Sequence, residues 1–169
     1  IYTKAKVTQK IYDQNGVLYR VITRTLNKQG RESRMEYSDK PGVYTDYEYD
    51  AQGFQFKTYS ESGPDISISQ NYYSNGNLDS TRYYKNGALT LTNVYTYYTD
   101  KENVLLSSTN GIPFYGGDKK NLMKSMTHVA VNGTITPEEY SYEFDATGRV
   151  TALKEVSPNG ASAVNYTYY

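Results

Sequence analysis

The stretch Tyr140-Ser-Tyr-Glu-Phe-Asp-Ala-Thr-Gly-Arg-Val150 decides the fold of this chain. It alternates aromatic and polar residues, reverses at Asp145-Ala-Thr-Gly148, and resumes alternation at Val150. Strict alternation is typical of a half-buried strand. A short polar run that ends in glycine supplies the positive backbone angle that a tight turn needs. The stretch therefore predicts a strand, a tight turn and a second strand.

Four further stretches repeat this pattern: Ile11-Tyr-Asp-Gln-Asn-Gly-Val17, Tyr47-Glu-Tyr-Asp-Ala-Gln-Gly-Phe54, Tyr72-Tyr-Ser-Asn-Gly-Asn77 and Tyr83-Tyr-Lys-Asn-Gly-Ala88. Three glycines, Gly30, Gly53 and Gly76, lie 23 residues apart, and the same interval leads to Thr99. We expect Thr99–Asn103 to be a turn without glycine. A period of this length fits a hairpin and its connection. The sequence thus predicts an all-β protein of successive antiparallel β-hairpin repeats, forming an extended twisted sheet or an open roll.

The 169 residues are enough for one large domain, and we expect a single β-repeat domain over residues 1–169. The longest loop-like segment, Ser107–Lys120, is the candidate sub-boundary or functional loop. In Asn121–Val131, helical and strand spacings compete. The β-branched residues Thr127, Val129 and Val131 favour a strand there.

The composition excludes several function classes. Lysine plus arginine and aspartate plus glutamate number 18 each, so no basic field favours nucleic acid. No apolar run reaches the roughly 18 residues of a transmembrane segment. Cysteine is absent, which excludes disulfides, thiol catalysis and cysteine-type zinc sites. The first residue is Ile1 rather than methionine, so we expect a processed or trimmed chain.

Catalytic groups are scarce. The one histidine, His128, lies in an expected strand, where a structural or exposed role is commoner than catalysis. Glycoside hydrolysis needs two carboxylates across a cleft, and Glu138 with Glu139, or Glu143 with Asp145, are the available pairs. Aspartates in turns usually bond the backbone, so we expect no catalytic residue, metal site or cofactor, and we expect a protein that is not an enzyme.

Tyrosine is the one abundant side chain suited to binding, with 21 copies. Seven crowd the middle of the chain, and we take them as candidate binding residues: Tyr72, Tyr73, Tyr83, Tyr84, Tyr95, Tyr97 and Tyr98. Consecutive tyrosines face opposite sides of a sheet. They either stabilise the sheet through cross-strand pairs or present an exposed row to a sugar or a protein segment.

The repeated aromatic hairpins resemble the YD repeats of the Rhs and teneurin shells. The order of Lys119-Lys-Asn-Leu-Met-Lys-Ser125, the Tyr140–Val150 hairpin and a terminal Tyr-Thr-Tyr resembles a group of Bacteroidetes lipoproteins of unknown function. Residues 72–88 are similar to the degenerate MORN-type repeats of secreted bacterial proteins. The resemblance implies an exported β-repeat protein with a lipid anchor outside this chain, and it brings no catalytic or binding residues with it.

We therefore expect an exported, non-catalytic module of the periplasm or outer-membrane surface that binds a protein or glycan partner. A purely structural spacer is a second reading. A carboxylate-based glycan hydrolase is the enzymatic alternative.

Overall fold

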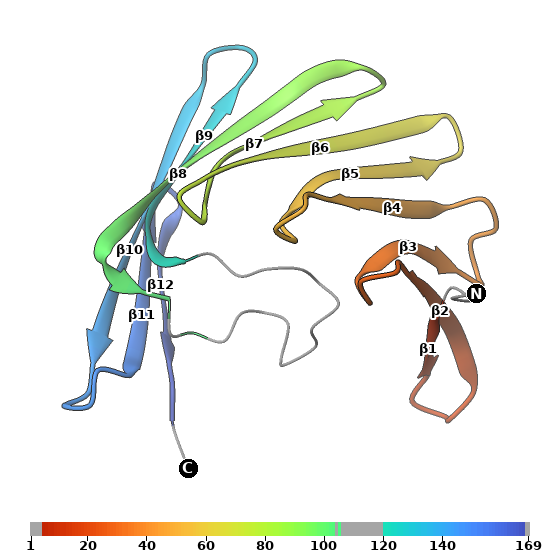
Figure 1. Ribbon diagram of the computed structural model, residues 1–169, viewed down its shortest axis with the longest axis horizontal. Coiled ribbons are helices and arrows are strands. Elements are labelled where there is room, and N and C mark those ends of the chain that lie inside the picture. Colours follow the sequence, from red (N-terminus) through yellow and green to blue (C-terminus); the bar gives the residue numbers. More distant parts are fainter. Residues whose placement is uncertain (1–4, 104, 106–119, 168–169) are drawn as a thin grey trace. The chain divides into compact units, whose positions relative to one another are not determined.

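The computed structural model describes residues 5–103, 105 and 120–167 of the chain. Among these residues there are strands, turns and bends but no helix, and no segment forms a helix that could cross a membrane. Twelve strands form one open antiparallel sheet in the order of the chain, from β1 to β12 (Figure 1). The predicted all-β class and the succession of hairpins are confirmed. The strands are β1 (Lys6–Tyr12), β2 (Leu18–Leu26), β3 (Glu32–Tyr37), β4 (Tyr44–Tyr49), β5 (Gln55–Ser62), β6 (Asp65–Ser74), β7 (Asn77–Lys85), β8 (Ala88–Glu102), β9 (Asn121–Ala130), β10 (Ile135–Phe144), β11 (Val150–Ser157) and β12 (Gly160–Asn165).

The chain divides into two compact units, which we describe separately. Of the described residues, unit 1 comprises 5–70 and 83–88, and unit 2 comprises 71–82, 89–103, 105 and 120–167. Strands β6, β7 and β8 therefore contribute residues to both units. The expected sub-boundary at 107–120 lies outside the described residues, apart from Lys120.

One turn geometry recurs in five hairpins. In the turn after β10, the amide of Asp145 donates to the carbonyl of Arg149 at 2.9 Å, and the amide of Gly148 donates back to the carbonyl of Asp145 at 3.0 Å. Gly148 has φ of 83°, a conformation that favours glycine. The same pair of bonds closes the turns that begin at Asp13, Asn27, Asp50 and Ala130. The repeat seen in the sequence is therefore a repeat of turn geometry.

Side chains reinforce four of these turns. The carboxylate of Asp145 accepts bonds from the amides of Thr147 (2.8 Å) and Arg149 (3.0 Å). Asp13, Asn27 and Asp50 cap the amides of their own turns in the same way. Each of the four hairpins also shifts register by one residue immediately before the turn, as hairpin loops with a left-handed glycine do. Hence these aspartates serve turns, as the sequence predicted.

Two tighter hairpins use Asn-Gly. Asn75 and Gly76 have φ of 51° and 81°, and Asn86 and Gly87 have φ of 50° and 82°. Positive φ at both central residues is the requirement of a type I′ turn, which matches the twist of the flanking strands. These turns follow β6 and β7, where the sequence predicted them.

The apolar core is small. Ile22 is buried in unit 1, whereas Leu78, Leu122, Tyr140 and Val150 are buried in unit 2. Buried polar residues are equally numerous: Thr25, Glu32, Thr81, Asn93 and Asn121. Within the described residues, no buried side-chain nitrogen or oxygen is left without a hydrogen bond. Burial of polar groups costs free energy unless they are bonded, so hydrogen-bond networks are an integral part of both cores.

Strand β9 confirms the strand predicted over Asn121–Val131, and its first residues explain the Lys-Asn-Leu segment. Leu122 is 1% exposed, and the buried Asn121 exchanges hydrogen bonds with Asn77 at 2.9 and 3.0 Å. The predicted turn at Thr99–Asn103 is wrong, because β8 continues to Glu102, which pairs with Asn121. The side-chain amide of Asn121 also donates to the carbonyl of Lys101 at 3.1 Å, which supports this extension of the strand.

Candidate functional site

The seven candidate tyrosines are divided between the two units. Tyr83 and Tyr84 belong to unit 1, whereas the other five belong to unit 2. Tyr72 is 42% exposed, and the guanidinium of Arg82 lies 5.1 Å from the centre of its ring. Tyr73, Tyr83 and Tyr84 are half-buried. The structure therefore offers Tyr72 as an exposed ring that already has a cationic neighbour.

The tyrosines of β8 are tied to the sheet through their hydroxyls. Tyr97 donates to the carbonyl of Leu78 at 2.9 Å, and burial raises the pKa of Tyr97. Tyr98 donates to the carbonyl of Tyr140 at 3.0 Å, and its ring meets Tyr142 edge-on at 6.1 Å. Burial, followed by the neighbouring Tyr98, raises the pKa of Tyr142 to about 12. Tyr97 thus connects β8 to the neighbouring β7, and Tyr98 connects β8 to β10 across β9, which is the stabilising role that the sequence left open.

A line of bonded polar side chains, here called the polar row, crosses five strands of unit 2. Its members come from β6 to β10: Asn71, Thr81, Tyr95, Asn93, His128, Glu138 and Tyr140. Thr81 donates to Asn71 at 2.8 Å, and longer contacts of 3.4 Å link Thr81 to Tyr95 and Tyr95 to Asn93. Two of the members, Thr81 and Asn93, are only 3% and 5% exposed. The row is thus an internal hydrogen-bond network.

His128 joins the two halves of the polar row. Its Nδ1 lies 2.8 Å from the Asn93 side-chain oxygen, and its Nε2 lies 3.1 Å from a Glu138 carboxylate oxygen. The other Glu138 oxygen accepts a bond of 2.8 Å from the Tyr140 hydroxyl. Burial, and secondly that bond to Glu138, raises the pKa of Tyr140. Both nitrogens of the histidine have protein partners, so the arrangement fixes the ring in place.

A depression of about 440 Å³ lies on the other face of the same strands of unit 2. Thr96, Ser125, Glu139 and Val156 are direct cross-strand partners from β8 to β11, so they share a face. The pairs of Asn93 with His128 and of Tyr95 with Met126 have the opposite parity, which puts these three members of the polar row on the far side, whereas Tyr140 of the row also borders the depression. The full lining is Thr96, Tyr98, Lys124, Ser125, Glu139, Tyr140, Ser141 and Val156.

The depression combines two tyrosines, Tyr98 and Tyr140, with groups that donate and accept hydrogen bonds. The hydroxyls of Thr96 and Ser125 lie 2.6 Å apart, and Tyr98 is the one candidate tyrosine in the lining. Lys124 and Glu139 are exposed, so an ammonium group and a carboxylate are available there. Glu139 is the one carboxylate among the described lining residues, since Glu138 serves the polar row and Asp145 serves its turn.

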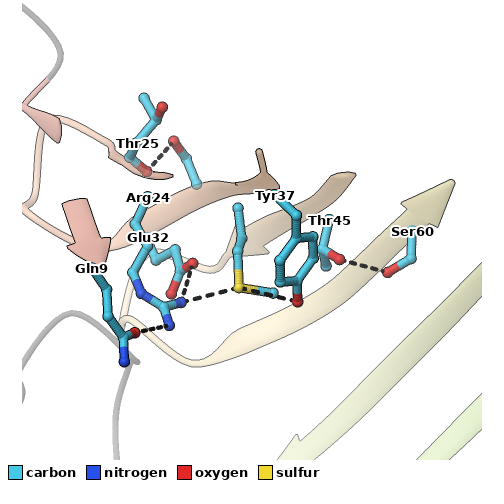
Figure 2. A network of polar contacts seen from close by, with 9 residues as sticks. Gln9, Arg24, Thr25, Glu32, Tyr37, Thr45 and Ser60 are labelled. Atoms are coloured by element: carbon cyan, nitrogen blue, oxygen red, sulfur yellow. Dashed lines mark hydrogen bonds and ion pairs between the residues drawn. The ribbon is translucent and has the colours of Figure 1, made fainter. Parts of the chain in front are cut away.

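Unit 1 contains a second network, around a buried ion pair. Figure 2 shows the guanidinium of Arg24 between the side chains of Gln9 and Glu32. Burial raises the pKa of Glu32, against the opposing effect of Arg24. Burial, and secondly the Glu32 carboxylate, raises the pKa of Tyr49 to about 12. The guanidinium of Arg24 and the carboxylate of Glu32 are both bonded within the protein, so we assign this network to stability.

The described residues offer no cluster of side chains suited to bind a metal ion. No group of three or more histidine, aspartate and glutamate side chains occurs within the described part of the chain. The polar row and the depression were both missed by sequence reasoning. Their residues come from four or five different strands, and the signal available in the sequence was the unusual placement of asparagine, threonine and histidine at inward positions.

Comparison with known proteins identifies a solved structure with a similar fold. No family model matches the chain, and no curated protein sequence is similar to it. Among solved structures, the chain is similar to a porin-like protein from Bacteroides uniformis, with a TM-score of 0.67 and 19% identity. The match covers 95% of this chain and 73% of that protein. At this identity the likeness shows a shared fold, an antiparallel all-β architecture.

Proposed function

We propose that this chain is a non-catalytic, exported β-module of the bacterial cell surface, and that unit 2 binds a glycan in the depression on β8 to β11. The observation that carries the proposal is the lining itself: two tyrosines, three serine or threonine hydroxyls, one ammonium group and one carboxylate around a hollow of about 440 Å³. Small-molecule sites of this size commonly pair apolar surface with a few polar groups.

The chemistry of the lining fits a sugar. A sugar ring has apolar C–H faces and a rim of hydroxyls that both donate and accept hydrogen bonds. Tyr98 and Val156 supply apolar surface, and the side chains of Lys124 and Glu139 supply a donor and an acceptor. Thr96 and Ser125 are bonded to each other and retain further lone pairs for a ligand.

The placement at the cell surface rests on two kinds of support. The aromatic hairpins resemble those of exported bacterial repeat proteins, and the structural relative carries the name of a porin-like protein from Bacteroides. The absence of catalysis is supported by the engagement of His128 and Glu138 in the polar row, and by the single carboxylate in the lining. A glycosidase would need a second acid across the site.

Affinity electrophoresis against a panel of soluble polysaccharides tests the proposal, with release of reducing ends measured in the same samples. Wild-type protein is expected to be retarded by at least one polysaccharide without releasing reducing ends. In the double variant Lys124→Ala/Glu139→Ala, the loss of two charged hydrogen-bonding groups should weaken binding about tenfold or more.

A matched control removes the same two side-chain types from unit 1. Lys28→Ala/Glu36→Ala changes an exposed lysine and an exposed glutamate outside the depression, so binding should be unchanged. Equal affinity of the two double variants would contradict the proposed site. Release of reducing ends would contradict the non-catalytic role, and migration unaffected by every polysaccharide would contradict glycan binding.

A further inference from the structure

Strand β12 is an edge strand without the usual protection. It pairs with β11 and, within the described chain, with no other strand. All of its residues, Gly160-Ala-Ser-Ala-Val-Asn165, are exposed. They include no charge and no proline, and the pairing with β11 has no register shift. Charges, prolines and bulges are the devices that keep edge strands from pairing with other chains.

Strand β1, at the other end of the strand order, contains such devices. It carries two exposed lysines, Lys6 and Lys10, and its register shifts between Ile11 and Tyr12. The two edge strands therefore differ in their protection. The lysines and the register shift of β1 oppose the addition of another strand, whereas β12 has neither.

The pairing of β12 with β11 fixes which backbone groups point outward. Ser157 and Gly160 face each other across a two-residue turn, and the amide of Tyr166 donates to the carbonyl of Thr151 at 2.9 Å. In an antiparallel pair, alternate residues bond to the neighbouring strand. The alternation that includes Gly160 and Tyr166 bonds to β11. The N–H and C=O groups of Ala161, Ala163 and Asn165 are consequently directed away from it.

We propose that β12 is a dimerisation strand, which pairs antiparallel with β12 of a second copy of this chain about a two-fold axis at Ala163. In this register Ala163 lies opposite Ala163 of the partner subunit, and Ala161 lies opposite Asn165 of the partner subunit. Each such pair exchanges two backbone hydrogen bonds, so the three pairs supply about six. The register uses every outward-directed backbone group of β12.

The side chains favour a second copy as the occupant. Between the two strands, alanine meets alanine, alanine meets asparagine, and serine meets valine, so neither like charges nor bulky side chains oppose each other. A two-fold contact of this kind also closes on itself within two copies, whereas pairing of β12 with β1 of another copy is a head-to-tail contact that leaves an open edge on each of the two copies. The inference is independent of the proposed glycan site.

Sedimentation equilibrium of the purified protein at increasing concentration tests the proposal. The wild-type mass is expected to rise toward twice that of one chain. Ala163→Lys and Ala163→Glu each place two like charges directly opposite across the axis, so each variant alone should be monomeric. An equimolar mixture of the two should form dimers again, because opposite charges then face each other.

Formation of dimers in the mixture would also show that both variants are folded, so that their monomeric state alone is not a failure to fold. Thr8→Lys, which adds the same charge to the exposed surface of β1, should leave the dimer intact. The proposal is overturned by wild-type protein that stays monomeric at every concentration, as expected if β12 receives a strand from a different protein. A dimer that persists in Ala163→Lys would overturn it equally.

Discussion

The carboxylate of Glu32, which is 1% exposed, accepts a hydrogen bond of 2.9 Å from the guanidinium of Arg24, which is 11% exposed. Arg24 lies on β2 and Glu32 on β3, on either side of the turn that begins at Asn27. Glu32 pairs directly with Leu26, two residues along β2 from Arg24, so the ion pair runs diagonally between the strands. Placing two charges out of water is costly, and an ion pair of this kind stabilises a fold mainly in comparison with one of its partners alone.

Removal of one partner should therefore cost more than removal of both. Arg24→Met leaves the buried carboxylate of Glu32 without its cation, and we expect a loss of about 3 kcal/mol in the free energy of unfolding. The double variant Arg24→Met/Glu32→Leu should be more stable than Arg24→Met. Urea denaturation followed by circular dichroism measures both, and a double variant less stable than the single one would contradict the interpretation.

The pH dependence of stability should reveal the same carboxylate. Burial raises the pKa of Glu32 above its ordinary value of 4.5. Its contribution to stability is then fully present below that value and is lost as pH rises through the folded-state pKa. Glu32→Gln has no such ionisation, so the stability of wild type minus that of Glu32→Gln should fall as pH rises above about 4.5. Glu36→Gln, at an exposed position of the same strand, should show no comparable change.

Asp145 should behave in the opposite way. Bonds to Thr147 and Arg149 hold the pKa of its carboxyl below the ordinary value of 3.8. This stabilising contribution is present above that value and is lost as pH falls through the lowered folded-state pKa. Asp145→Asn should flatten the acid side of the unfolding profile relative to wild type. Asp100→Asn, at an exposed position of β8, should leave the profile as it is.

Alanine substitutions at two turn glycines should distinguish the effect of backbone strain on stability from that of steric crowding. Gly53 and Gly16 have φ of 98° and 77°, and each should lose about 1 kcal/mol of stability when replaced by alanine. A Cβ at Gly53 would also overlap the guanidinium of Arg31, which lies 5.8 Å from the ring centre of Tyr49, whereas one at Gly16 would meet open space. Gly53→Ala should thus be the more destabilising variant, and the difference should vanish in an Arg31→Ala background.

The polar row should respond to removal of a single hydroxyl. Thr81→Val keeps the shape of a side chain that is 3% exposed and removes its bond to Asn71. We expect a loss of about 1–2 kcal/mol in the free energy of unfolding. Thr8→Val, on the exposed surface of β1, should change stability by less than about 0.5 kcal/mol. Similar values for the two variants would show that the polar row does not contribute to stability.

The sequence predicted those features that depend on neighbouring residues. Asp145-Ala-Thr-Gly148 contains both the capping carboxylate and the glycine of its turn, so local chemistry was enough to identify it and its counterparts. The strand at Asn121–Val131 followed from its β-branched residues. The turn expected at Thr99–Asn103 was wrong, because its placement came from a period, whereas the extension of β8 depends on contacts with Asn121 in β9.

The candidate sites depended on longer-range information. Asn93, His128 and Glu138 meet only because β8, β9 and β10 pair in one specific register, and no single stretch of sequence contains that register. Tyr98 was chosen because it lies in a tyrosine-rich stretch. It borders the depression but, like Tyr95 and Tyr97 from the same stretch, is also hydrogen-bonded within the sheet. The abundance of tyrosine does not by itself distinguish rings that are exposed to a ligand from rings that hold strands together.

Because strand order equals chain order, each strand joins the edge formed by the one before it. Contacts of this kind keep the loops that must close during folding short, which lowers the entropic barrier. A chain that emerges from a ribosome or an export channel from its N-terminus can therefore build the sheet hairpin by hairpin, without waiting for its last residues. For the same reason, a hairpin can be gained or lost during evolution while only the strands on either side of it have to find new partners.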